Sequence, residues 1–446
     1  MSASYPVPAC LSRRHGVART RPSCAGGRRG LSRLVMKFGG TSVADLERIR
    51  RVAALVALEV AAGGRVAVVV SAMAGKTNEL VAWTDGAGPA GGELEASDEE
   101  YDAVVASGEQ VTAGLLAMTL RNMGLAARSW MGWQIPILTD GAHGRARIDD
   151  ISPDRLAAAL DAGEIAVVAG FQGVTREGRL ATLGRGGSDT TAVAIAAVLK
   201  AARCDIYTDV DGVYTTDPRI EAKARRLATI SYEEMLEMAS VGAKVLHTRS
   251  VELAMAYGVP VRVLSSFAAT GPARDQGTIV CGEEEIVEKR IVSGVAYSRD
   301  EAKISLFGLP DHPGVSSEIF GRLADANVNV DMIVQSHARG EGAANMEFTV
   351  SKRDAARAVD VVRSARDAIG FQDLAVNEDV AKVSVIGVGM RSHAGVAKTM
   401  FGALAAKGVN IQVIATSEIK ISVLIDAAYT ELAVRALHAA YGLDQL

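Results

Sequence analysis

An internal repeat near the C-terminal end constrains the fold of this 446-residue chain most strongly. The segment 311–315 (DHPGV) reappears 81 residues later as 392–396 (SHAGV), and this offset aligns nine identical residues within 18 positions. Each copy reads as strand, His-x-Gly turn, helix, strand, strand, helix. That order predicts two ferredoxin-like βαββαβ units, which we place at residues 291–372 and 378–446.

The preceding part of the chain alternates between strand and helix patterns. Strands are expected at 34–38, 66–70, 165–169 and 206–207, and helices at 45–61, 105–123, 153–161 and 190–203. Continuous β-branched runs suit strands that are buried on both faces. The alternation therefore predicts an α/β domain over residues 34–280, with a mostly parallel sheet covered by helices on both faces. Such sheets bind ligands beyond the carboxyl ends of their strands.

The first 33 residues differ from the rest in composition. They contain seven arginines and no acidic residue, in a chain whose net charge is −4. No apolar segment follows the arginines, which excludes a secretory signal. A start codon assigned too far upstream and an organelle transit peptide both fit, so we treat residues 1–33 as an extraneous or disordered leader.

Composition excludes several classes of protein. No stretch approaches the roughly 18 apolar residues of a membrane-spanning helix. The net charge of −4 gives no basic footprint for nucleic acid. The four cysteines are scattered without a CxxC pair, which indicates reduced thiols in a cytoplasmic protein, with neither a disulfide framework nor a zinc site.

The strongest local signal is the run 35–42 (VMKFGGTS), in which a strand leads through Lys37 and two glycines into a helix. Glycines let the backbone approach a phosphate closely, and the lysine supplies a cation. An ordinary strand–turn–helix joint is the alternative. A P-loop is excluded, because Gly75-Lys76-Thr77 lacks the first glycine of that motif, whose position is occupied by Val70.

Three further clusters contain residues suited to binding. The run 184–189 (GRGGSD) opens a helix and offers Arg185 for a carboxylate, although Asp189 could merely cap that helix. The polar loop 207–219 (YTDVDGVYTTDPR) follows a buried strand, where binding residues commonly lie. The runs 107–109 (SGE) and 242–245 (GAKV) place an acid and a lysine beside glycine.

Together these motifs resemble those of the aspartate kinases of the amino-acid-kinase superfamily. The resemblance runs from about Leu34 to the C-terminus, and the repeats look like that family's paired ACT domains. It implies a three-layer α/β sandwich followed by two ACT domains. It also implies transfer of a phosphoryl group from MgATP to the β-carboxylate of L-aspartate, the first step of lysine, threonine and methionine biosynthesis.

The resemblance assigns roles residue by residue. Lys37 and Asp189 would be catalytic, with Asp189 orienting the cations; Arg185 would bind the α-carboxylate of aspartate and Glu109 its α-ammonium. Ser71, Thr77 and Ser188 would contact substrate or phosphate. The expected ATP-binding residues are Lys37, Phe38, Gly39, Gly40, Thr208, Asp209, Tyr214, Thr215, Thr216, Asp217, Pro218, Arg219 and Lys244. No metal-binding side chain is expected, since ATP would bring the magnesium ion, and no organic cofactor is implied.

The repeats are expected to bind amino-acid effectors. Asn329 and Asn410 occupy equivalent positions, and their amides suit an α-amino and α-carboxyl pair, although both could simply cap turns. Asp331 and Gln335 follow Asn329 at spacings that predict one shared strand face. The complete expected effector set is Asn329, Val330, Asp331, Gln335, Val396, Ala397, Asn410, Ile411, Ser417 and Glu418. By resemblance the effectors would be lysine and threonine, acting on a homo-oligomer or an assembly with a shorter product that contains only the repeats.

Two other functions compete with this one. The chain could phosphorylate another acid, such as glutamate or a nucleotide, but the combination of the repeats with SGE and GRGGSD argues against this. It could also be a catalytically silent amino-acid-binding regulator, against which the intact Lys37, Arg185 and Asp189 argue.

Overall fold

The structure is a computed structural model that describes residues 32–87, 99–242, 245–267, 277–286, 290–337, 342–393 and 395–445. Lys244 and the leader up to residue 31 lie outside the described residues. The first strand begins at Arg33, one residue earlier than the sequence predicted. The Arg33 guanidinium forms an ion pair with Asp161 at 2.8 Å, so Arg33 belongs to the folded body and not to the leader.

An eight-stranded sheet forms the centre of the N-terminal part, in the order β10-β12-β11-β9-β1-β2-β6-β3. All neighbours pair in parallel except β11 and β12. The strands are β1 (Arg33–Phe38), β2 (Arg65–Val70), β3 (Ala127–Trp130), β6 (Ile165–Ala169), β9 (Arg203–Thr208), β10 (Thr229–Ser231), β11 (Val261–Ser265) and β12 (Thr278–Cys281).

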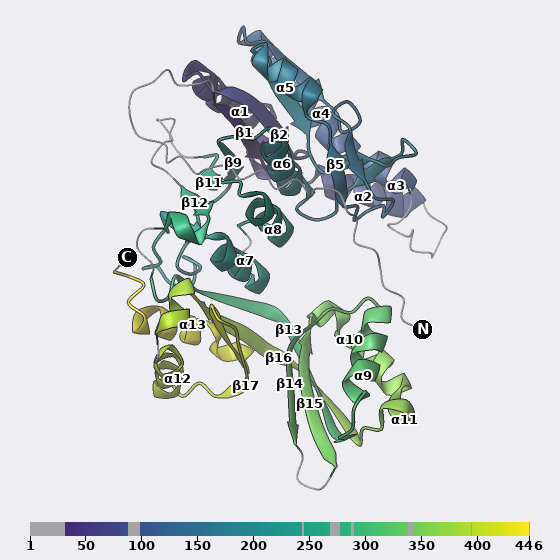
Figure 1. Cartoon of the computed structure of the whole chain (residues 1–446), viewed down its shortest axis with the longest axis vertical. Coiled ribbons are helices and arrows are strands. Elements are labelled where there is room, and N and C mark those ends of the chain that lie inside the picture. The colour runs from purple at the N-terminus through teal and green to yellow at the C-terminus, as the bar shows by residue number, and fades with distance from the viewer. Residues whose placement is uncertain are drawn as a thin grey trace, which may run out of the picture. The chain divides into compact units, whose positions relative to one another are not determined.

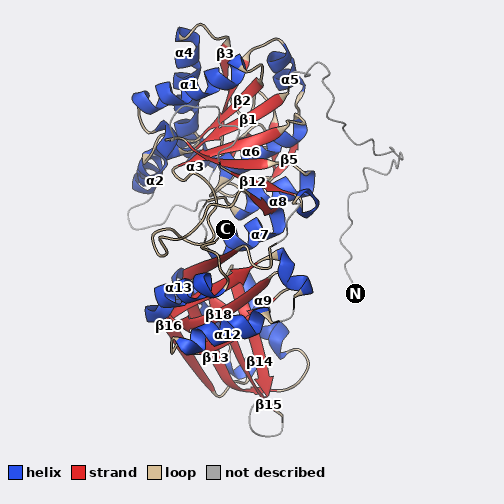
Figure 2. Ribbon diagram, turned by 90° about the vertical axis from the view of Figure 1, so that its left-hand side faces the viewer, coloured by secondary structure: helices blue, strands red, loops and turns tan. Residues whose placement is uncertain are grey.

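Helices cover both faces of this sheet (Figure 2). The helices α1 (Leu46–Ala61) and α4 (Ser107–Asn122) share one apolar core with the sheet. The opposite core contains α5 (Asp154–Asp161), α6 (Gly187–Val198), α7 (Tyr232–Val241) and α8 (Thr248–Tyr257). The three predicted layers are therefore confirmed. Helix α6 begins three residues earlier than expected and ends by residue 198, because β9 begins at Arg203.

A smaller sheet, in the order β5-β4-β7-β8, lies beside these layers. It consists of β4 (Ile137–Thr139), β5 (Ile148–Ile151), β7 (Gln172–Val174) and β8 (Leu180–Thr182). Two helices, α2 (Lys76–Ala87) and α3 (Glu99–Val105), contact each other, and α3 also packs against β8. Strand β8 leads directly into the 184–189 motif.

The two repeats share one six-stranded sheet, in the order β14-β15-β13-β16-β18-β17. Its strands are β13 (Gly294–Pro310), β14 (Val330–His337), β15 (Ala343–Val350), β16 (Asp373–Ile386), β17 (Ile411–Thr416) and β18 (Lys420–Asp426). The helices are α9 (Val315–Asp325), α10 (Lys352–Ser364), α11 (Arg366–Ile369), α12 (Val396–Ala406) and α13 (Thr430–Ala440). Helices α9 and α12 begin 81 residues apart, after Gly314 at φ 106° and Gly395 at φ 100°. Such positive φ angles favour glycine, which explains why the turn is repeated.

The long strands β13 and β16 interlock the repeats (Figure 1). Lys303–Phe307 of β13 pairs with the start of β16, whereas Gly294–Ser298 pairs with its end, at 382–386. Val292 and Val295 pack in the core of the second repeat, together with Val383. The first repeat is thus inserted between one strand of the second repeat and the rest of it, an arrangement that differs from two consecutive segments at 291–372 and 378–446.

One helical stretch within the described residues, Glu99–Asn122, is long and apolar enough to span a membrane. Half of its apolar window is buried inside the protein. In α4 the buried residues include Leu116 and Leu120, which belong to the core beneath the central sheet. The apolar composition of this stretch is therefore explained by its packing in a core.

Candidate active site

The predicted binding residues converge because neighbouring parallel strands end at one edge of the sheet. Strand β1 ends at Phe38, β2 at Val70 and β9 at Thr208, and these three strands are adjacent. The backbone N–H of Ser71 donates to the carbonyl of Phe38, and that of Gly39 donates to the carbonyl of Tyr207. The segments that follow the three strands are therefore held side by side at this edge.

Lys37 and Asp189 form an ion pair at the centre of this edge. The Nζ atom of Lys37 lies 2.5 Å from Oδ1 of Asp189, and both side chains are largely buried. Asp189 lies in the first turn of α6, whose N-cap is Gly186. Asp189 therefore does not cap the helix, and its carboxylate is directed to the lysine instead.

Two glycines keep the space around Lys37 open. A Cβ atom on Gly39 would lie 3.3 Å from the Lys37 Nζ, and one on Gly40 would lie 3.0 Å from the carbonyl oxygen of Ala72. Either side chain would crowd the lysine or the neighbouring loop. The Phe38 ring stacks on Tyr207 with ring centroids 4.6 Å apart and is fully buried, so only the backbone of Phe38 can face a ligand.

Glu109 contributes a buried carboxylate beside the same edge. The side chain is only 3% exposed. Its Oε1 accepts a hydrogen bond from the backbone N–H of Ala72 at 2.9 Å, whereas Oε2 has no hydrogen-bond partner among the described residues. Burial raises the pKa of Glu109 to about 7, although the hydrogen bond from Ala72 opposes this rise. An unpaired buried carboxylate oxygen suits a cationic ligand group.

The 184–189 motif is fixed by close backbone packing. A Cβ atom on Gly186 would lie 2.3 Å from the ring of His247, and one on Gly187 would lie 2.8 Å from the ring of Phe171. Ser188 is buried, and its hydroxyl oxygen would lie 2.8 Å from a Cβ on Gly170. By contrast Arg185 is exposed, and its guanidinium makes no ion pair within the described part of the chain.

Some residues of the loop after β9 are exposed or half-buried, and others are buried within the protein. Thr208 donates to the carboxylate of its exposed neighbour Asp209, and the hydroxyl of the half-buried Tyr214 donates to Asp211. Asp217 forms an ion pair with the exposed Arg219 at 2.7 Å, which holds its pKa below the usual value. These residues remain available to a nucleotide, as do the half-buried Ser71 and Thr77 to a substrate.

Thr215, one of the residues expected to bind ATP, also contacts the repeats. It is fully buried. Its hydroxyl lies 2.9 Å from Nε2 of His438 in α13 and accepts from the N–H of Arg225, and its carbonyl accepts from the N–H of Val295. The contacts with His438 and Val295 join this loop to the C-terminal part of the chain, and the assignment of Thr215 to ATP stays a prediction. Thr216, also buried, has a hydroxyl without a hydrogen-bond partner in the described structure.

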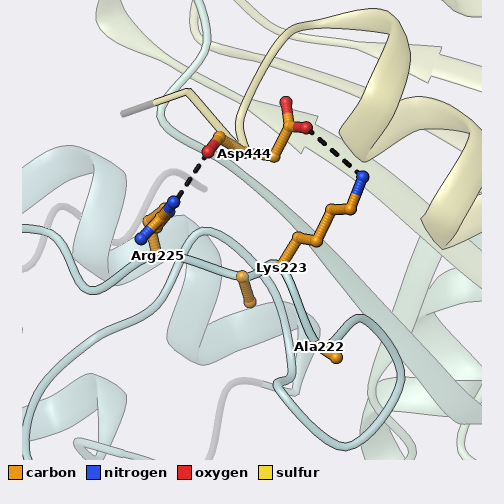
Figure 3. Close-up of a pocket in the computed structure, with 5 residues that line it drawn as sticks. Ala222, Lys223, Arg225 and Asp444 are labelled. Atoms are coloured by element: carbon orange, nitrogen blue, oxygen red, sulfur yellow. Dashed lines mark hydrogen bonds and ion pairs between the residues drawn. The ribbon is translucent and has the colours of Figure 1, made fainter.

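A recess of about 340 Å³ lies just beyond this loop and is lined by residues 222–225 and Asp444 (Figure 3). The Nε of Arg225 donates to the Asp444 carbonyl at 3.1 Å, and the Nζ of Lys223 lies 3.8 Å from the Asp444 carboxylate. Both cations are thus directed to the end of the chain. The recess belongs to the contact with the second repeat and not to the site around Lys37.

The expected effector residues do not all share one face. Asp331 pairs with Thr349 of β15, but Gln335 pairs with Met346, because one extra residue intervenes in β14 near Met332 at φ 45°. Since Thr349 and Met346 are three residues apart in a strand, Asp331 and Gln335 point to opposite faces. The predicted shared face is therefore wrong.

Their contacts agree with this assignment. Asp331 accepts a hydrogen bond from Nζ of Lys382 at 2.6 Å. Burial would raise the pKa of Asp331, but the charge of Lys382 lowers it overall. Gln335 instead lies 3.4 Å from the hydroxyl of Ser316 at the start of α9. Asn329 and Asn410 are both exposed, and each directly precedes the equivalent strand of its repeat, β14 or β17. Glu418 pairs with Arg391 at 3.3 Å.

Sequence reasoning missed two groups of residues. Thr215 and His438 are separated by 223 positions, so no local pattern could reveal their contact. Asp102 of α3 is completely buried and accepts hydrogen bonds from Thr182 and Gly144 at the base of the 184–189 motif. In the sequence Asp102 follows the acidic run 98–100 and reads as one more charged residue at the start of an exposed helix, so nothing marks it as buried.

Comparison with known proteins gives a consistent result. The amino acid kinase family matches residues 32–265, and an ACT domain matches residues 304–365 and 383–441. Aspartate kinase of Pseudomonas fluorescens is 51% identical over 412 residues, which cover 92% of this chain and 98% of the relative. Aspartokinase of Mycobacterium tuberculosis is 47% identical over 414 residues, covering 92% of this chain and 96% of the relative.

Solved structures with the same fold include two complexes of E. coli aspartokinase III. The complex with aspartate and ADP (R-state) has a TM-score of 0.76 at 30% identity and covers 91% of this chain and 99% of its own. The complex with lysine and aspartate (T-state) has a TM-score of 0.71 at 30% identity and covers 91% of this chain and 98% of its own.

Proposed function

The chain belongs to the amino acid kinase family and, within it, to the aspartokinases, and from that premise we propose how its residues divide the work of the reaction. The enzyme transfers the terminal phosphoryl group of ATP to the β-carboxylate of L-aspartate and forms 4-phospho-L-aspartate. This is the first step of lysine, threonine and methionine biosynthesis, and its ACT domains make it subject to allosteric regulation.

The observation that carries the proposal is the buried ion pair between Lys37 and Asp189. Lys37 neutralises the charge on the phosphoryl group as it moves from ATP to aspartate, and Asp189 orients the ammonium group. Such transfer depends mainly on positioning and electrostatics. The backbone of Phe38, Gly39 and Gly40 lies against the phosphates, because side chains are absent or turned away there.

Aspartate is held by two charges of opposite sign. The free Oε2 of Glu109 receives the α-ammonium group, and the exposed Arg185 binds the α-carboxylate through its two-pronged guanidinium. Ser71, Thr77 and Ser188 complete the contacts with substrate or phosphate. The β-carboxylate is then free to face the γ-phosphorus of ATP.

The reaction needs no general base. A carboxylic acid with an ordinary pKa near 3.9 is already ionised at pH 7. One oxygen of the β-carboxylate forms a bond to the γ-phosphorus while the bond to the β,γ-bridging oxygen breaks, and ADP leaves with that electron pair. Hydrogen-bond donors and cations, which this edge of the sheet supplies, are what such a step requires.

The nucleotide lies along the loop after β9. The residues of this loop that we assign to ATP, together with Lys244, are Thr208, Asp209, Tyr214, Thr215, Thr216, Asp217, Pro218 and Arg219. Magnesium enters as MgATP, held by the phosphates. No group of three or more acidic, cysteine or histidine side chains that could hold a metal ion occurs among the described residues.

Regulation is assigned to the repeats. We assign effector binding to Asn329, Val330, Gln335, Val396, Ala397, Asn410, Ile411, Ser417 and Glu418, with Asp331 on the opposite face of the sheet. Lysine and threonine are the effectors, and the lysine complex of E. coli aspartokinase III supports this role for lysine. The protein acts in the cytoplasm as a homo-oligomer or with a shorter product containing the repeats.

An assay of acyl-phosphate formation tests the proposal. Hydroxylamine traps 4-phosphoaspartate, so the rate of hydroxamate formation is compared with aspartate and with glutamate, each with magnesium and with excess chelator. We expect hydroxamate only with aspartate, ATP and magnesium together. Equal rates with glutamate would indicate another acid kinase, and a rate unaffected by the chelator would contradict the assignment of MgATP.

A further inference from the structure

We propose that Asp102 is a positioning residue that holds the backbone beneath Arg185 in the conformation that binds aspartate. The inference rests on the proposed role of Arg185. Asp102 lies in α3, in neither the 107–109 nor the 184–189 motif, and is completely buried. A buried carboxylate is costly unless its oxygens are well paired, so its partners indicate what it holds together.

Three donors from two segments converge on the Asp102 carboxylate. The Thr182 hydroxyl donates to Oδ1, and the Gly144 backbone N–H lies 3.1 Å from the same oxygen. Nδ1 of His143 lies 2.7 Å from Oδ2 and, when it carries the proton, donates to it. Helix α3 is thereby joined to β8 and to the segment 141–146, which lie 80 and 41 residues away in the sequence.

Both segments form the base of the loop that carries Arg185. Thr182 is the last residue of β8 and precedes Arg185 by only three positions. The carbonyl of Thr182 accepts from the N–H of Ala146 at 2.9 Å. A Cβ atom on Gly184 would lie 3.1 Å from the Gly144 carbonyl oxygen, so the two segments are also in direct contact.

A second side chain, that of Arg249, also binds the backbone at the base of this loop. The guanidinium of Arg249 in α8 donates to the carbonyl of Leu183 and to that of Ala146, both at 2.9 Å. The base of the loop is therefore held between Asp102 and Arg249. Arg185 itself is exposed and forms no ion pair in the described structure, so its direction depends on this backbone.

Asparagine cannot replace this carboxylate without loss. An amide offers one acceptor oxygen and two N–H donors, whereas the site presents three donors. The amide oxygen could keep Thr182 and Gly144, but an NH2 group in place of Oδ2 would face Nδ1 of His143 and could pair with it only in the tautomer that carries its proton on Nε2. Unless that tautomer forms, the contact with His143 is lost and the base of the loop shifts. A small displacement of a substrate-positioning group strongly affects catalysis.

Kinetics of Asp102→Asn in the full-length enzyme test the inference. We expect the KM for aspartate to rise about tenfold or more, since a misplacement of about 1 Å can reduce rates by up to about 100-fold. The KM for ATP should stay within about twofold, because none of the contacts of Asp102 described above involves a residue of the loop 207–219.

Asp205→Asn is the matched control. Asp205 is also completely buried and paired with arginine, 2.6 Å from Arg262, but it lies in β9 away from the 184–189 motif. This control should lower the thermal midpoint at least as much while leaving the KM for aspartate unchanged. A rise in both Michaelis constants for both variants would reduce Asp102 to a purely structural role and overturn the inference.

Two further variants separate the possible failures. Arg185→Lys should raise the KM for aspartate; if it does not, the proposed role of Arg185 fails. If Arg185→Lys raises that KM but Asp102→Asn does not, the positioning role fails while the proposed function stands. Should Asp102→Asn not fold, Thr182→Val removes one donor at nearly constant shape, and an unchanged KM for aspartate in that variant would equally overturn the inference.

Discussion

Aspartate binding should weaken as the pH falls through about 7, and replacing Glu109 by glutamine should remove this dependence. An ordinary glutamate has a pKa near 4.3 and would be ionised throughout this range. Burial raises the pKa of Glu109 to about 7, with the hydrogen bond from Ala72 opposing the rise. Because a protonated Glu109 carries no charge for the substrate ammonium, affinity is present above this pKa and is lost below it.

The magnitude follows from the ionised fraction. With a pKa of about 7, Glu109 is about 10% ionised at pH 6 and about 90% ionised at pH 8. Apparent affinity scales with the competent fraction, so the KM for aspartate should be about tenfold higher at pH 6 than at pH 8. Turnover at saturating aspartate should not follow this titration, because saturation selects the ionised form.

The assay measures initial rates of ADP release from pH 5.5 to 8.5, with aspartate varied and ATP saturating. The substrate ammonium stays protonated over this range and does not contribute. Glu109→Gln should show a raised KM for aspartate that is flat with pH. A flat profile in the wild-type enzyme, or the same pH dependence retained in Glu109→Gln, would refute the role of this carboxylate.

Two further predictions concern the ends of the chain. Asn410→Ala should raise the concentrations of lysine and threonine needed for half-maximal inhibition, because alanine lacks the amide that would bind the α-amino and α-carboxyl groups of the effector. An unchanged inhibition curve would remove Asn410 from the effector site. Deleting residues 1–31 should leave activity and the thermal midpoint unchanged, whereas deletion through residue 33 also removes the ion pair between Arg33 and Asp161 and should lower the midpoint. Equal midpoints for the two truncations would contradict the placement of Arg33 in the folded body.

The features that sequence predicted correctly depend on local rules. Lys37 lies where a buried strand meets a helix, and the parallel strands β1, β2 and β9 bring such points to one edge of the sheet. The 184–189 motif instead follows β8 of the smaller sheet, and its glycines and Asp189 mark the start of α6. The repeat was visible because Gly314 and Gly395 both need a positive φ, which few other residues adopt. Each of these motifs can be recognised from a few consecutive residues.

The features that sequence could not predict depend on distant or irregular contacts. Thr215 reads as part of a polar loop, but α13 buries it from 223 residues away. One additional residue in β14 moves Gln335 to the face opposite Asp331, and simple alternation cannot anticipate a bulge. The interlocking of β13 with β16 likewise depends on which strands pair, and not on their order in the chain.

Whether Lys37 carries the charge of the transferred phosphoryl group is tested most directly by the turnover of Lys37→Ala at saturating aspartate and ATP. Lys76→Ala is the matched control, because Lys76, the first residue of α2, is exposed and paired with Glu79. Loss of one group that stabilises a transition-state charge typically costs about 100- to 1,000-fold in turnover. We therefore predict a loss of turnover of at least that size in Lys37→Ala. Lys76→Ala should keep both normal turnover and an unchanged thermal midpoint. Turnover close to that of the wild type in a folded Lys37→Ala variant would contradict the proposed mechanism.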